Sequence, residues 1–232
     1  MWGSLVDGGA PPAAAARYLA AWTIGRLGGV AAVTLAVAGA ALLPSHVRFR
    51  RHPGGWFDGV DVDAAALAVP AGHAWVGLPG VDVVADAALL PVRAREALVA
   101  AAAPVVAACA SLTRGSVRAL WSEVADGAAQ GLVTFASSPG ALEAGFGPDD
   151  AGVALADATL TSLLGSRDDP RRGPWPSRPR VLLGAPGVLV VRRGGCCLAW
   201  TAGERDVASA CSTCVLRTDA DSVALQLAAR VP

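Results

Sequence analysis

Four of the five cysteines in this 232-residue chain lie within one short stretch near its C-terminus. Cys196 and Cys197 are adjacent, and Cys211 and Cys214 form a Cys-x-x-Cys pair after an intervening loop of 13 residues. A loop of that length can form a hairpin that brings all four sulfur atoms together. Four converging thiols make either a metal site or a pair of disulfides.

The spacing of the cysteines bears on which metal they would bind. Thiolates are soft ligands that select zinc, Cu(I) or iron–sulfur clusters, and four of them suit structural zinc or a [2Fe–2S] cluster. Zinc sites space each cysteine pair by two to four residues; the second pair obeys this rule and the first does not. Neighbouring side chains point apart in an extended chain, so the first pair requires a sharp backbone turn. We expect Gly194 and Gly195 to supply the necessary freedom.

This stretch resembles the C-terminal motif of the FhuF-type ferric-siderophore reductases, in which basic residues precede a vicinal cysteine pair and Cys-x-x-Cys follows. The resemblance reaches upstream to Pro104–Val106, Arg114 and Ser116–Asp126, which are similar to the helical pair that precedes the motif in that family. The resemblance implies a [2Fe–2S] cluster held by Cys196, Cys197, Cys211 and Cys214. It also implies an iron–sulfur oxidoreductase that reduces ferric iron in a siderophore, with the hydroxamate type favoured.

The implied reaction is chemically simple. Hard oxygen chelators hold Fe(III) tightly and Fe(II) much less so, so that one electron releases the metal. The sequence shows no evident Ser-His-Asp set, P-loop or dinucleotide fingerprint. We therefore expect an external electron donor, such as a ferredoxin or a flavoprotein. The arginines around the cysteines would either form a positive rim for an anionic chelate or an acidic donor, or be solvated surface; they are Arg192, Arg193, Arg205 and Arg217.

Two other classes of function stay open from the residues. The four cysteines could bind structural zinc and fold a protein-interaction module. Alternatively, Cys211 and Cys214 could form a reversible disulfide as a thiol redox switch.

Composition bears on partners and compartment. The formal net charge is zero, which argues against a nucleic-acid binder. Five cysteines are few for a secreted, disulfide-stapled chain, and no basic region precedes an apolar core at the N-terminus, so a cytoplasmic location is favoured. The uncharged run from Leu27 to Leu43 is rich in alanine and glycine and sits at the lower limit for spanning a membrane. We interpret it as a buried core helix rather than a membrane span.

The hydrophobic pattern predicts an α+β fold in two parts. Residues 1–180 would form a mainly helical body with a small antiparallel sheet, which would contain the siderophore-binding region. Residues 181–232 would form a hairpin-and-helix unit that carries the cluster. The segment 166–180, rich in proline and charge, is the candidate linker between them.

Individual elements follow from periodicity and turn signals. Helices are predicted at 12–26, 30–43, 93–112 with a break or kink at Pro104, 114–135, 148–165 and 219–230. Strands are predicted within 47–62 and at 76–78, 81–84, 181–183 and 188–191. Among single residues, we expect Tyr18, Trp22, Cys109 and Trp121 to be buried without a chemical role, Val117 to belong to the buried stripe of its helix, and Glu123 and Asp126 to lie on a solvated face.

Overall fold

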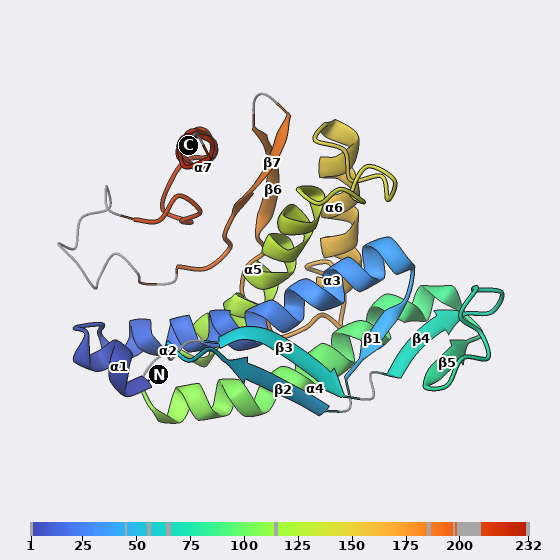
Figure 1. Ribbon diagram of the computed structural model, residues 1–232, viewed down its shortest axis with the longest axis horizontal. Helices are drawn as coiled ribbons and strands as arrows, with labels where there is room; N and C mark the ends of the chain where they lie inside the picture. The colour runs from blue at the N-terminus through green and yellow to red at the C-terminus, as the bar shows by residue number, and fades with distance from the viewer. Residues whose placement is uncertain are drawn as a thin grey trace.

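The computed structural model describes residues 2–44, 46–54, 57–63, 66–113, 116–184, 187–196, 198 and 210–230. Figure 1 shows a helical body with short strands around it, which confirms the α+β class. The helices are α1 (Trp2–Asp7), α2 (Pro12–Ala20), α3 (Arg26–Ala38), α4 (Leu90–Ser111), α5 (Val117–Ala136), α6 (Asp150–Leu164) and α7 (Asp219–Ala228). The strands are β1 (Ala41–Leu43), β2 (His46–Arg51), β3 (Phe57–Asp63), β4 (Ala66–Pro70), β5 (Val81–Val84), β6 (Arg180–Gly184) and β7 (Val188–Arg192).

The first long helix differs from the two helices that the sequence predicted. A π-helical turn, η1 (Ala21–Gly25), joins α2 to α3, so that one continuous helix runs from Pro12 to Ala38. Gly39 then adopts a φ of 60°, a left-handed conformation that commonly ends helices. The residues at 41–43, predicted to be helical, consequently form strand β1.

The strands form three small sheets. β2 pairs with β3 and β6 pairs with β7, both antiparallel, as predicted for the first pair from alternation and for the second from two short apolar runs separated by a turn. β1, β4 and β5 form a third sheet in the order β1-β4-β5, in which β1 and β4 are antiparallel and β4 and β5 are parallel. The strand predicted at 76–78 is wrong: Val76 and Leu78 donate backbone hydrogen bonds to His73 and Trp75 in consecutive turns.

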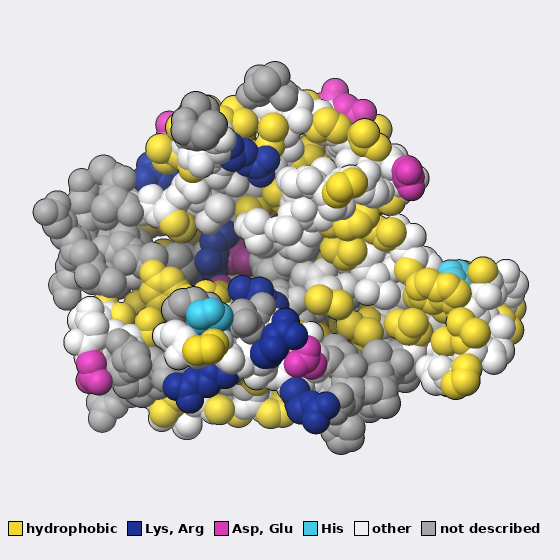
Figure 2. Space-filling model, viewed as in Figure 1, with side chains coloured by type: hydrophobic (Ala, Val, Ile, Leu, Met, Phe, Trp, Pro, Cys, Tyr) yellow, Lys and Arg dark blue, Asp and Glu magenta, His cyan; other side chains and the backbone are white. Residues whose placement is uncertain are grey.

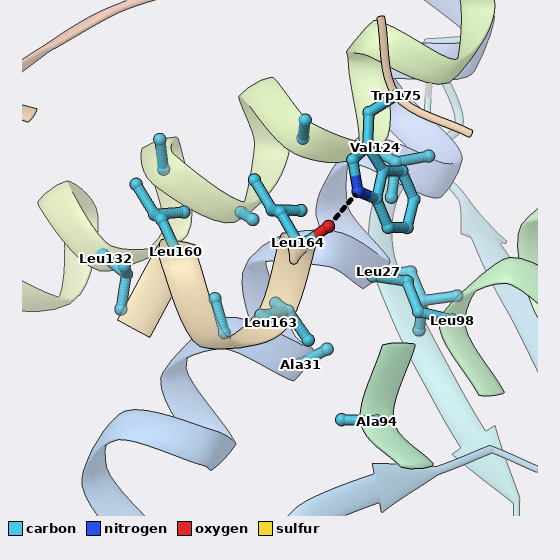
Figure 3. Packing of buried hydrophobic residues seen from close by; sticks show 14 of the residues in the cluster. Leu27, Ala31, Ala94, Leu98, Val124, Leu132, Leu160, Leu163, Leu164 and Trp175 are labelled. Carbon is cyan, nitrogen blue, oxygen red and sulfur yellow. Dashed lines mark hydrogen bonds between the residues drawn. The ribbon is translucent and has the colours of Figure 1, made fainter. Parts of the chain in front are cut away.

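One apolar cluster fills the space between α3, α4, α5 and α6 (Figure 3). The residues labelled there are Leu27 and Ala31 of α3, Ala94 and Leu98 of α4, Val124 and Leu132 of α5, Leu160, Leu163 and Leu164 of α6, and Trp175. Val181, Leu189 and Val191 of the β6–β7 hairpin belong to the same cluster. The C-terminal hairpin thus shares its core with the helical body.

The helix predictions around this cluster hold with small changes. α4 runs through Pro104 as one helix, and Cys109 near its end is 4% exposed, as expected. In α5 the buried stripe includes Trp121, but Val117 at the first position is exposed. Burial raises the pKa of the Cys109 thiol, so this cysteine behaves as a small apolar residue.

The segment 166–180 forms a loop, as predicted, and it packs against the body. The Trp175 indole N–H donates to the carbonyl of Leu164 at 2.7 Å (Figure 3). The buried guanidinium of Arg95 pairs with Asp169 at 2.7 Å and donates to the carbonyl of Leu163 at 2.8 Å. These contacts position the start of β6 against α6.

Two helical stretches are long and apolar enough, by length and composition, to cross a membrane. They are Pro12–Ala38 and Ala87–Ser111, and half of the apolar window in the first is buried inside the protein. Leu27, Ala31 and Ala32 of that stretch lie in the core, in agreement with the core-helix interpretation of this part of the run.

Glycines set the distance between the N-terminal helix and α5. Gly25 and Gly29 on one helix face Gly127 and Gly131 on the other, and each pair is four residues apart. A Cβ on Gly127 would overlap the carbonyl oxygen of Gly25, and one on Gly131 would overlap the Cα of Gly29. Because Gly25 meets Gly127 and Gly29 meets Gly131, the two helices run in the same direction at the crossing. Their backbones are in direct contact.

Replacing Gly127 by alanine tests this crossing. Alanine favours the helix by about 1 kcal/mol, but its Cβ meets backbone that cannot rotate away. We expect a net loss of about 1–3 kcal/mol in the free energy of unfolding, measured by urea denaturation. Gly140→Ala is the control, since a Cβ there meets no atom within 4 Å. Equal urea midpoints for Gly127→Ala and the unmodified protein would contradict the assigned contact.

Candidate functional site

The segments that carry the cysteines form one small unit at the C-terminal end of the chain. We call the β6–β7 hairpin, residues 193–196, residue 198, residues 210–218 and α7 the cysteine unit; Figure 1 shows it above the N-terminal helix and α5. The backbone N–H of Arg193 donates to the carbonyl of Thr213 at 2.8 Å. This bond joins the chain just before Cys196 to the middle of the Cys211–Cys214 pair. The segment that leads toward Cys196 is therefore bonded to the turn between Cys211 and Cys214.

The side chain of Gln226 on α7 strengthens this arrangement. Its amide N–H donates to the carbonyl of Val191 at 2.8 Å, and its carbonyl oxygen accepts from the Val191 N–H at 3.2 Å. The same amide nitrogen donates to the carbonyl of Ser212 at 3.4 Å. One glutamine thus connects α7, strand β7 and the Cys-x-x-Cys turn.

Backbone N–H groups point at two of the sulfur atoms. Leu198 N donates to Cys196 Sγ at 3.4 Å, and Leu216 N donates to Cys214 Sγ at 3.5 Å. The Cys211–Cys214 pair is itself a tight turn, closed by a 3.0 Å bond from the Cys214 N–H to the Cys211 carbonyl. N–H donors of this kind stabilise a thiolate and tune a bound metal group.

The sharp turn predicted at residues 194–197 includes Cys197, which lies outside the described residues, but the backbone on either side of that residue can be compared with the prediction. Leu198 has a φ of 61°, a left-handed conformation that is uncommon and strained for a branched side chain. Gly194 and Gly195 are not left-handed. They are required for space: a Cβ on Gly195 would lie 2.5 Å from Ser122 Cβ, and one on Gly194 would lie 2.7 Å from the backbone of Arg178.

A buried ionic network docks the cysteine unit on α5. Glu123 and Asp126, predicted to be solvated, are only 1% and 5% exposed, which corrects that interpretation. Arg193 donates to carboxylate oxygens of both residues, with Nε 3.0 Å from Asp126. Asp126 also accepts backbone N–H bonds from Gly194 at 2.7 Å and from Gly195 at 3.3 Å. A single carboxylate therefore holds the two residues before Cys196.

Arg17 of α2 completes the network from the other side. Its Nε lies 2.6 Å from Glu123 Oε1, so Glu123 is placed between two guanidinium groups. Figure 2 shows basic and acidic atoms together in a hollow between the cysteine unit and the helical body. The network connects α2, α5 and the chain before Cys196, three segments that are distant in sequence.

One donor of this network has no acceptor among the residues that the structure describes. Arg17 Nη2 is buried, makes no hydrogen bond there, and lies against Gly195, since a Cβ on that glycine would be 3.1 Å away. A buried N–H without a partner is costly, so an acceptor is expected nearby. Together with the N–H groups directed at sulfur, this donor fits a negatively charged thiolate-bound group beside Cys196.

The predicted ligands are described only in part. Cys197 lies outside the described residues. Among the residues that are described, no disulfide joins the cysteines, and no group of three or more His, Cys, Asp or Glu side chains lies close enough to hold a metal ion. Cys214 is 2% exposed, while Cys196 and Cys211 are half-buried. A backbone hydrogen bond links Arg193 to Thr213, and the convergence of the four sulfurs on one point stays a prediction.

Three of the four predicted rim arginines can be placed, since Arg205 lies outside the described residues. Arg193 lies between Glu123 and Asp126, as described above. Arg192 pairs with Asp219 at 3.1 Å and donates to the carbonyl of Val215 at 2.9 Å. Arg217 donates to the carbonyls of Ala210 and Cys211. Each of the three therefore has partners within the chain and helps to fold the cysteine unit.

Two cavities lie beside the network. A polar cavity of about 130 Å³ is bounded by Glu123, Asp126 and Arg193 on one side and by Thr213 on the other. A larger groove of about 660 Å³ follows the crossing of the N-terminal helix and α5. The two share Ala21, Gly127 and Gln130 in their linings. The groove and the smaller cavity, which Thr213 of the Cys-x-x-Cys turn also lines, are therefore neighbours.

Comparison of the chain with models of known families, with curated proteins and with solved structures found no match. The function is therefore inferred from the residues of this chain and their geometry.

Sequence patterns missed the residues that position the site, namely Arg17, Glu123, Asp126 and Gln226. Arg17 lies in the alanine-rich first part of its helix, and the two acids lie on a helix whose other faces are largely apolar. A charged side chain in a largely apolar helix is buried only when it has a partner. The charged residues at these positions could therefore have suggested an ion pair, but the sequence does not show which residues form it.

Glu123→Gln tests the ionic network. The substitution keeps the shape but leaves the buried guanidinium of Arg17 and the half-buried guanidinium of Arg193 without the carboxylate that they share. We expect a loss of about 3–5 kcal/mol in the free energy of unfolding. Glu96→Gln, at an exposed position of α4, should change it by less than about 0.5 kcal/mol. Urea unfolding measures both, and similar effects of the two variants would refute a buried network.

The pH dependence of stability tests the environment of Asp126. Burial raises its pKa to about 6, against the lowering effect of Arg193, and Glu123 adds to the rise. Between the usual aspartate pKa and about 6, the folded protein binds more protons than the unfolded chain, so this contribution to stability is present at low pH and lost as pH rises through 6.

The unmodified protein should therefore lose stability relative to Asp126→Asn as the pH rises from about 4.5 to about 7.5. The difference in the free energy of unfolding between the two proteins should decrease over that range. Urea denaturation of both proteins across that range measures it, with Asp157→Asn on the exposed side of α6 as the control. A difference that increases with pH would show that the ion pair with Arg193 outweighs burial.

Proposed function

We propose that this protein is a ferric-siderophore reductase that acts in the cytoplasm on hydroxamate chelates. Cys196, Cys197, Cys211 and Cys214 would hold a [2Fe–2S] cluster, which supplies one electron at a time when bound. The observation that carries the proposal is the hydrogen bond from the Arg193 N–H to the Thr213 carbonyl. It supports a common site for two cysteine motifs that are separated in the sequence by a 13-residue loop.

The reaction requires little of the protein beyond binding and positioning. One electron converts Fe(III) to Fe(II), whose weaker affinity for hard oxygen ligands releases it from the chelate. No acid or base needs to act in that step. The electron comes from an external one-electron donor, a ferredoxin or a flavoprotein.

The residues of the site have defined tasks under this proposal. Asp126 and Arg193 orient the backbone before Cys196, and Gln226 orients the Cys-x-x-Cys turn. The backbone N–H groups of Leu198 and Leu216 stabilise thiolates at Cys196 and Cys214. Burial of Cys214 keeps water from that sulfur.

The turn at Cys211–Cys214 also suits a zinc knuckle, and a Cys-x-x-Cys pair suits a reversible disulfide. The colour of the protein distinguishes the [2Fe–2S] cluster from the zinc site and the reversible disulfide. An oxidised [2Fe–2S] protein is reddish-brown and absorbs in the visible range, whereas zinc protein and disulfide protein are colourless. Colour in protein purified without air supports the proposal, and its absence after reconstitution with iron and sulfide opposes it.

Substitution of single cysteines tests the ligand assignment. Cys196→Ser should abolish both the visible absorption and the reduction of a ferric hydroxamate, because a thiolate ligand is lost. Cys109→Ser is the matched control: this cysteine lies in the core near the end of α4, so both properties should persist. Absorption spectra and a ferrous-iron assay report them. An unchanged spectrum in Cys196→Ser would remove that residue from the ligand set.

A further inference from the structure

The groove along the helix crossing lies outside the proposed cluster site. Its volume of about 660 Å³ lies within the range of about 300–1,000 Å³ that is usual for small-molecule sites. Its lining comes from η1, α3, α5 and strand β3. Trp22 and Tyr18, both expected in the core, are only half-buried. Trp22 belongs to this lining, as do Val30, Val33, Val60 and Phe135.

Two backbone features build this groove. The four glycines of the crossing, Gly25, Gly29, Gly127 and Gly131, all belong to its lining, so backbone rather than side chains forms its floor. The wall at Trp22 lies on the π-helical turn η1, an irregularity that often marks functional sites. Alanine forms helix better than glycine at each of these positions, but its methyl group would fill the space between the two helices.

The charges around the groove indicate what it would bind. Among the described residues that line it, Arg26 is the one charged side chain, and Thr34, Gln130 and Thr134 supply neutral polar groups. A chelate with several negative charges would lose its hydration there without enough compensating cations. Fe(III) bound by three hydroxamates is electrically neutral, because each hydroxamate carries one negative charge. Such a chelate matches an apolar lining with a few hydrogen-bonding groups.

The groove is also a neighbour of the cysteine unit. It shares Ala21, Gly127 and Gln130 with the smaller cavity that Thr213 lines. A ligand in the groove would lie on the same side of α5 as the cysteine unit. We infer that this groove is the binding site of the ferric chelate and that it takes electroneutral trihydroxamates in preference to tris-catecholates, an inference that rests on the proposed function.

A chelate that cannot be reduced separates binding from catalysis. Ga(III) has the charge of Fe(III) and a similar size, so a Ga(III) trihydroxamate should bind whether or not the protein transfers electrons. Val30→Trp and Thr34→Trp, one helical turn apart on α3, place a bulky ring in the groove. We expect each to weaken binding by at least about tenfold in isothermal titration calorimetry.

The structure offers a closely matched control. Val37 lies on the same helix and is 42% exposed, against 43% for Val30, but it does not line the groove. Val37→Trp should therefore leave the affinity unchanged, and circular dichroism should show that all three variants are folded. A Ga(III) tris-catecholate, with three net negative charges, should bind the unmodified protein at least about tenfold more weakly than the trihydroxamate.

Each other result overturns the inference. These results are no Ga(III) trihydroxamate binding by the unmodified protein, equal weakening by Val37→Trp and Val30→Trp, or equal affinity for the tris-catecholate. Loss of self-association in Val30→Trp, seen by sedimentation with unchanged chelate affinity, would assign the groove to a second copy of the chain. Failure of the proposed function gives a different result. A colourless protein that still binds the Ga(III) chelate in the groove would support the binding site and refute the reductase function.

Discussion

The buried carboxylates of α5 are the constraint on which the site depends. Glu123 and Asp126 lie in the interior, where a carboxylate is stable only with close partners. Those partners come from both ends of the chain: Arg17 from the N-terminal helix and Arg193 from the segment before Cys196. Asp126 adds the N–H groups of Gly194 and Gly195. Removing any member takes away a partner of a charge in this network, so the cysteine unit and the helical body hold each other in place.

The glycine-mediated crossing has two consequences that belong together. Contact between the backbones at Gly25–Gly127 and Gly29–Gly131 brings the N-terminal helix close to α5, and Arg17 lies on that same helix, where it reaches Glu123. The same glycines leave open space on the outer side of the crossing, where the groove lies. One packing solution therefore provides both the ionic anchor of the cysteine unit and a site large enough for a ligand.

The sequence predicts local structure well where one signal dominates. Alternation and turn signals predicted the β2–β3 hairpin, two short apolar runs around a turn predicted β6 and β7, and the apolar stripe with Trp121 predicted α5. Prediction failed where alanine and glycine carry the structure: the run to Leu43 was taken as helix, although Gly39 ends the helix and β1 follows. It also failed at Glu123 and Asp126, because local periodicity cannot show that arginines 106 and 67 residues away supply their partners. The type and spacing of the cysteines predict a site, and that stays a prediction, whereas the ionic network beside Cys196 depends on tertiary contacts that local patterns do not show.

Native mass spectrometry of the intact protein, purified without air, tests the central claim most directly. The account predicts a mass increase that corresponds to two irons and two sulfides, lost together when the cluster is removed. One bound zinc ion would show that the cysteines serve folding, and a mass that shows only a disulfide between Cys211 and Cys214 would show a thiol switch. Either of these results would contradict the electron-transfer account.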